Sequence, residues 1–149
     1  MTRIFPTAQD AENAFYEALE RADLDAMMAV WAEDEEIVCV HPGGPRLAGL
    51  EQVRESWRRI FSGGPGPRAN VSQQLVIPGM MTAVHSVYEN FVLEDPQGNP
   101  TPVPVVATNV YVRTPAGWRM VVHHASPLPP QQPVQQTGGE MHDAPKTLH

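Results

Sequence analysis

Cysteine is almost absent from this chain: Cys39 is the only one in 149 residues. A single cysteine excludes a disulfide within the chain and any zinc site built from several cysteines. Long hydrophobic runs are absent too, because no apolar stretch approaches the roughly 20 residues that a membrane-spanning helix needs. Residues 1–7 carry one basic side chain and no apolar core, so we expect no secretory signal and a cytoplasmic protein.

Basic residues are also scarce, with 10 Lys and Arg against 17 Asp and Glu, a formal net charge of -7 and a pI near 5.2. Nucleic acids and anionic membranes bind basic surfaces, and the only basic cluster is Arg58-Arg59. We therefore expect neither as a partner. Cys39 lies between two valines, where burial keeps a thiol neutral, so we interpret it as a core residue rather than a reactive one.

The overall composition is typical of a globular protein, with 42% hydrophobic and 18% charged residues. The length predicts a single domain, which we place over residues 1–127. Beyond Pro127 the chain becomes rich in proline and glutamine and has no periodic apolar pattern. We therefore expect residues 128–149 to form a C-terminal tail outside the domain.

Three amphipathic helices are predicted before residue 62. Apolar residues recur at helical spacing after Thr7 and again after Asp23, and both residues can cap a helix. Gly49 precedes the third helix, which a Gly- and Pro-rich run ends. Methionine and tryptophan side chains form a stripe on the second helix; we interpret the stripe as core and keep Trp31 as a candidate for contacting a substrate.

From Asn70 onward the apolar period changes to two, which predicts strands. The strands expected from pattern and turn residues cover residues 37–41, 70–77, 81–93, 103–113 and 118–126. Pro102 and Pro104 lack the N–H that a central strand needs, so their strand should begin at an edge or in a bulge. Helices that precede a run of hairpins predict an α+β fold, with three N-terminal helices packed on the concave face of a curved, mostly antiparallel sheet.

Several short motifs occur along the chain in a set order. They are Asp23-Leu24-Asp25 before a helix, Trp31-Ala32-Glu33-Asp34, the His41-Pro42 turn, Gly49 before a helix, and the terminal strand from Gly117 to Ser126. In this order they resemble the SnoaL-like, nuclear transport factor 2-like superfamily over residues 8–127. The resemblance implies a cone-shaped α+β barrel that encloses a cavity and is often dimeric. Members include ketosteroid isomerase, polyketide cyclases, dehydratases and non-catalytic association domains, so the fold does not choose the function.

The resemblance to ketosteroid isomerase breaks down at its catalytic positions. That enzyme's base is a carboxylate just before a proline at the end of the first strand, and here the position is His41 before Pro42. The tyrosine that polarises its substrate corresponds to Phe15, with Tyr16 one position away. Steroid isomerisation is therefore not expected, and Tyr16 is kept as a candidate substrate-binding residue.

Two histidines are the candidate catalytic residues. His41 lies on the apolar face of its short strand, and His124 shares strand parity with Trp118 and Ser126. If Trp118 marks the core face, His124 and Ser126 point into the cavity and His123 points away. An imidazole in such a cavity titrates near neutral pH and suits proton transfer. The alternative is that either ring is a core histidine bonded to backbone carbonyls.

Polar groups on the long strands are candidates for holding a substrate oxygen. Tyr88 shares one strand face with Asn90, and Asn109 shares another with Tyr111, so one pair should face inward. We take Tyr88 and Asn109 as candidate substrate-binding residues, together with Trp118 and Ser126. The alternative for each is an ordinary sheet residue.

No close-spaced ligand motif joins His41, His124 and a carboxylate such as Glu89, so we expect neither a metal nor a cofactor. Three function classes remain: a small acid–base enzyme of isomerase, cyclase or dehydratase type, a binding module for a small ligand, and an association domain. The expected partner is a small apolar or carbonyl-bearing molecule. Because the helices can cover only one of two apolar sheet faces, we also expect a homodimer joined through the sheet.

Overall fold

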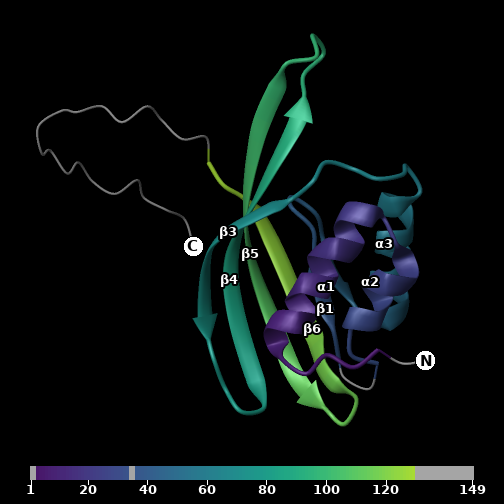
Figure 1. The fold of residues 1–149 in the computed structure, drawn as a ribbon. Coiled ribbons are helices and arrows are strands. Elements are labelled where there is room, and N and C mark those ends of the chain that lie inside the picture. Colours follow the sequence, from purple (N-terminus) through teal and green to yellow (C-terminus); the bar gives the residue numbers. More distant parts are fainter. Residues whose placement is uncertain (1–2, 34–35, 130–149) are drawn as a thin grey trace, which may run out of the picture.

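The computed structural model describes residues 3–33 and 36–129, which form three helices and one six-stranded sheet (Figure 1). The helices are α1 (Ala8–Arg21), α2 (Leu24–Val30) and α3 (Leu50–Phe61). The strands are β1 (Val38–Val40), β2 (Arg46–Ala48), β3 (Asn70–Ile77), β4 (Thr82–Glu94), β5 (Pro100–Thr114) and β6 (Gly117–Pro127). The helices all lie on one side of the sheet (Figure 1), so the predicted α+β fold is confirmed.

The strand order is β2-β1-β6-β5-β4-β3, and every neighbouring pair is antiparallel except β1 and β6. No helix among the described residues is both long and apolar enough to cross a membrane. The predicted tail lies outside the described residues apart from Leu128 and Pro129.

The predicted helix starts are correct because each depends on a local cap. The Thr7 hydroxyl accepts a hydrogen bond from Asp10 N at 3.0 Å, and Asp23 Oδ1 accepts one from Ala26 N at 3.0 Å. These bonds satisfy N–H groups that the first turn of a helix leaves unpaired. Gly49, with φ of +88°, turns the chain into α3 in a backbone conformation that favours glycine.

The two prolines of β5 lie where their missing N–H groups do no harm. β5 pairs with β4 from Pro100 to Val112, but with β6 only from Val105 onward. Pro102 and Pro104 therefore lie in a part of β5 that has one neighbouring strand, as the sequence predicted. The far end of the β4–β5 hairpin extends beyond the rest of the sheet (Figure 1).

A β-bulge in β6 decides which side chains face the helices. Tyr111 pairs with Met120 and Val110 pairs with Val122, so Val121 is an extra residue on β6. One extra residue turns all following side chains to the opposite face. The prediction for the end of this strand is therefore wrong: His123 faces inward and is 3% exposed, whereas His124 is exposed on the outer face.

The core lies between the helices and the inner face of the sheet. Its largest fully buried side chains include Trp31, Phe15, Met27 and Tyr111, and each buried apolar side chain of this size stabilises the fold by about 1.5–3 kcal/mol. Cys39 is also fully buried, and burial, with a smaller effect of the Glu89 charge, raises its pKa to about 12. The thiol is therefore a neutral core group, as expected.

Candidate functional site

An apolar pocket of about 240 Å³ opens between α3, the end of β1 and the inner face of the sheet. Its walls come from apolar and aromatic side chains, chiefly Leu19, Trp57, Ile60, Phe61 and Phe91. Three polar side chains also line it: His41 after β1, Glu89 on β4 and His123 on β6. An apolar cavity with a few convergent titratable groups is the usual form of a small-molecule site.

Of the described residues that line this pocket, Glu89 is the one that carries a carboxyl group. It is 2% exposed, and Tyr16 on α1 donates a hydrogen bond to its Oε2 at 2.6 Å. Burial raises the Glu89 pKa to about 7, helped by the charge of Glu12 and opposed by the Tyr16 hydrogen bond. Near neutral pH this carboxyl is therefore present in both protonation states, which is the condition for acid–base catalysis.

Behind Glu89 a chain of hydrogen bonds runs across three elements. Tyr16 donates its only proton to Glu89, so its oxygen accepts from Asn109 Nδ2 at 3.0 Å. This orients the Asn109 amide so that Oδ1 faces His123, whose Nδ1 lies 2.6 Å away. Amide oxygen only accepts, so His123 Nδ1 carries the proton and Nε2 is left as an acceptor.

His123 remains neutral through the physiological range. Burial, with smaller contributions from the neighbouring His41 and His124 rings, lowers its pKa to about 3. Its ring packs beside Phe15, with centroids 4.8 Å apart, and against the edge of the pocket. The side chain is therefore a fixed, uncharged acceptor.

His41 lines the same pocket from the turn after β1. Its Nε2 lies 3.0 Å from Ser56 Oγ, and Ser56 donates its own proton to Val53 O at 2.7 Å. Ser56 can therefore only accept from His41, so Nε2 carries the proton and Nδ1 holds a free lone pair. Its ring meets Trp57 edge to face with centroids 4.7 Å apart, and burial lowers the His41 pKa below its ordinary value.

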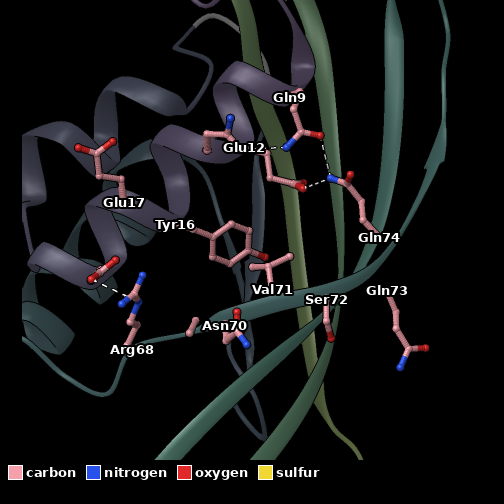
Figure 2. Close-up of a pocket in the computed structure, with 13 residues that line it drawn as sticks. Gln9, Glu12, Tyr16, Glu17, Arg68, Asn70, Val71, Ser72, Gln73 and Gln74 are labelled. Carbon is pink, nitrogen blue, oxygen red and sulfur yellow. Dashed lines mark hydrogen bonds and ion pairs between the residues drawn. The ribbon is translucent and has the colours of Figure 1, made fainter.

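A second hollow, of about 510 Å³, lies between α1 and β3 and is polar (Figure 2). At its base Glu12 accepts a bond from Gln74, while Gln74 also bonds Gln9 (Figure 2). Glu12 accepts further bonds from His85 Nδ1 and the Tyr111 hydroxyl, each at 2.8 Å. This carboxylate has its lone pairs occupied by the protein itself, which marks a structural role.

The structure brings some of the predicted site residues together. His41 lines the pocket, Tyr16 donates to the pocket carboxylate, and Asn109 orients Tyr16. Of the two polar strand pairs, the Asn109 and Tyr111 pair is the inward one.

Other predicted site residues lie elsewhere, and these assignments are corrected. Tyr88 is half-buried on the outer face of β4, and His124 and Ser126 are exposed on the outer face of β6 because of the bulge at Val121. Trp31 is fully buried in the core and does not line the pocket.

Trp118 lines a different shallow hollow together with His85. The described residues contain no group of three or more Asp, Glu, His or Cys side chains placed to hold a metal.

Glu89 and His123 line the pocket, yet neither was among the predicted site residues. A signal for Glu89 was present, because the inward residues of β4 are Ala83, His85, Val87 and Glu89, a strand face that mixes apolar and titratable groups. No comparable signal marked His123, since the bulge that turns it inward comes from pairing with β5.

Comparison with known proteins agrees with this architecture. The family model described as a SnoaL-like domain matches residues 9–130. This chain belongs to the SnoaL-like family. The domain also resembles a Thiobacillus denitrificans protein assigned as a calcium/calmodulin-dependent protein kinase type II association domain, with 41% identity and a TM-score of 0.76. That match covers 85% of this chain and 99% of the other.

Two further proteins that are similar to this chain are of different kinds. A Streptomyces avermitilis protein assigned as a dehydratase of the NTF2-like family has 33% identity and a TM-score of 0.71, over 79% of this chain and 91% of the other. The F-box protein SKIP8 of Arabidopsis thaliana is 25% identical over 114 residues, which are 75% of this chain and 46% of that protein. The chain thus spans about half the length of this curated relative.

Proposed function

We propose that this SnoaL-like protein binds a small, uncharged, largely apolar molecule and catalyses proton transfer on it, with Glu89 as general acid and His41 as general base. The observation that carries the proposal is the opposite effect of the pocket on these two groups. Burial raises the Glu89 pKa to about 7 and lowers the His41 pKa. Near pH 6.5 to 7 (roughly) a protonated carboxyl and a neutral imidazole therefore coexist in one pocket, the arrangement that separates acid from base in enzymes.

Elimination of water is the reaction that this pair supports best. Glu89 gives its proton to a leaving hydroxyl, the C–O bond breaks and water departs. His41 Nδ1 takes the proton from the adjacent carbon, and the C–H electrons form the new double bond. The protonated imidazole and the carboxylate then exchange a proton through solvent, which restores both groups. The likeness to a protein assigned as a dehydratase supports this choice.

The charge of the pocket supports an uncharged substrate. Among the residues that the structure describes, no lysine or arginine lines it, and both imidazole rings that face it have lowered pKa values. An anionic ligand would meet the Glu89 carboxylate without a compensating cation, which is unfavourable in a buried site.

The test uses an aromatic β-hydroxyketone, whose dehydration to the conjugated enone is followed by ultraviolet absorbance. Removal of a general acid or base typically lowers the rate by ~10²–10⁴-fold, so we expect losses of this size for Glu89→Gln and His41→Gln. Glu94→Gln, on the exposed end of the same strand as Glu89, serves as the matched control and should keep the rate.

The rate should also follow a bell-shaped pH profile. It should fall above pH of about 7 as Glu89 loses its proton, and fall again below the lowered His41 pKa as the imidazole gains one. A probe that binds in the pocket while wild type and both variants give the same rate would favour the non-catalytic binding module instead.

A second function, association between copies, is favoured by the outer face of the sheet. Half-buried valines line this face on three neighbouring strands, among them Val84, Val106, Val110 and Val122, and all three helices lie on the opposite face. We propose that this face joins two copies into a homodimer, which the likeness to a protein assigned as an association domain also supports. Sedimentation at micromolar concentration should give a dimer that Val110→Glu dissociates, and a wild-type monomer would contradict the proposal.

A further inference from the structure

Three polar atoms of the pocket residues have no partner among the described residues: Glu89 Oε1, His123 Nε2 and His41 Nδ1. Within the described part of the chain, the fully covered side-chain nitrogens and oxygens without a partner are the indole nitrogens of Trp31 and Trp57. The other three atoms are therefore not fully covered, and their residues line the pocket. We assign His123 Nε2 and His41 Nδ1 as acceptors, because the other nitrogen of each ring faces an oxygen that can only accept, Asn109 Oδ1 or Ser56 Oγ. A ligand must therefore supply a donor to complete them.

The acceptor at His123 is fixed by tertiary structure rather than by the ring itself. Its Nδ1 proton is donated to Asn109 Oδ1. A rotation of the Asn109 amide by 180° would place Oδ1 against the acceptor oxygens that now face Nδ2. Asn109 Nδ2 faces the Tyr16 oxygen at 3.0 Å and Glu12 Oε2 at 3.4 Å, and Glu12 is itself held by His85 and Tyr111. The orientation of His123 thus depends on groups from α1, β4 and β5.

We infer that His123, held by Asn109 with its proton on Nδ1, selects ligands that carry a hydroxyl group next to the general acid. This rests on the proposed function, since Glu89 supplies the second contact. A hydroxyl accepts a proton from Glu89 through its oxygen and donates its own to His123 Nε2. A ketone or an ether of the same shape can accept from Glu89 but leaves Nε2 unpaired. His123 is therefore a specificity-determining residue, and Asn109 is a positioning residue.

The binding test uses three probes with one skeleton: 2-indanol, 2-methoxyindane and 2-indanone. Titrations followed by protein NMR at pH 6 keep Glu89 mostly protonated, because its pKa is about 7. We expect 2-indanol to bind about tenfold more tightly than the ether and the ketone, as one added hydrogen bond in a buried site implies. Equal affinities for all three would overturn the inference while leaving a working pocket. No binding by any probe would overturn both this inference and the proposed function.

Two variants assign the preference to His123. His123→Phe keeps an aromatic ring but removes the acceptor, so the three affinities should come to within about threefold of one another. His124→Phe is the matched control on the outer face of the same strand and should keep the preference for 2-indanol. A preference that persists in His123→Phe would overturn the assignment.

The tautomer provides a test on the wild-type protein that does not depend on a variant folding. The ¹⁵N shifts of His123 should show a protonated Nδ1 and a bare Nε2 between roughly pH 5 and 8, since burial keeps its pKa at about 3. Asn109→Leu should release the ring to carry its proton on Nε2 and should weaken the selection for 2-indanol. A wild-type ring protonated on Nε2 would overturn the inference.

Discussion

Two glutamates, both only 2% exposed, differ in what surrounds them. Glu12, which lines the polar hollow of Figure 2, accepts hydrogen bonds from His85, Tyr111 and Gln74 and a longer one from Asn109. Glu89, in the apolar pocket, accepts from Tyr16 alone among the described side chains. Equal burial therefore gives different chemistry, because the number of donors decides how well a buried carboxylate is stabilised.

The difference separates a structural role from a chemical one. Glu12 joins α1 to β4 and β5 through groups that are already paired with it. Glu89 keeps one oxygen free for a ligand, and burial raises its pKa to about 7. Functional sites commonly retain such incompletely paired groups, at some cost in stability.

The largest effect is expected from removing the structural carboxylate. Glu12→Leu leaves several buried donors without an acceptor, and each such group costs about 1–3 kcal/mol. We expect the free energy of unfolding to fall by about 3 kcal/mol or more in denaturant melts at pH 7. Glu17→Leu, on the exposed side of α1, is the control and should change stability by less than about 0.5 kcal/mol. A small effect of Glu12→Leu would show that Glu12, like Glu89, has no structural role in stabilising the fold.

Glu89 should have the opposite influence on stability. Its pKa rises from an ordinary 4.5 to about 7 on folding. Between these values the unfolded chain releases a proton that the folded protein keeps, so this group lowers stability as pH rises from 4.5 to 7. The loss is of the order of 3 kcal/mol. Glu89→Gln should remove it, so the variant should gain stability over wild type across that window. Denaturant melts at pH 4.5 and 8 measure the change, and parallel pH dependences would contradict it.

Tyr16→Phe removes the hydroxyl that donates a hydrogen bond to Glu89. Because the Tyr16 hydrogen bond lowers the Glu89 pKa, its removal should raise that pKa further and move the upper limit of the pH–rate profile to higher pH. The freed Asn109 amide should cost about 1 kcal/mol of stability. Direct ¹³C NMR titration of the Glu89 carboxyl measures the first effect, and an unchanged titration would show that Tyr16 does not influence it.

The smallest effect is expected on the outer face. His124→Gln should change neither the dehydration rate nor the free energy of unfolding by more than about 0.5 kcal/mol, because the side chain is exposed. Rate assays and melts beside His41→Gln check this directly. A rate loss for His124→Gln comparable with that for His41→Gln would restore His124 to the site.

The order of the elements follows from local sequence. Thr7 and Asp23 cap their helices, Gly49 begins α3, and apolar alternation marks the long strands. The motifs that resemble the superfamily are local as well. Such signals depend on neighbours within a few residues, so pattern alone is enough to predict them.

Tertiary structure decided which side chains meet in the pocket. Pairing with β5 makes Val121 an extra residue, and this turns His123 inward and His124 outward although both occur in the same strand pattern. Tyr16 and Glu89 lie 73 residues apart, and so do Glu12 and His85. The sequence determined which residues could titrate, but the number of donors around each carboxylate depends on distant elements packing together. The protonation state of Glu89 and the directions in which His123 and His124 point are therefore set by the folded molecule.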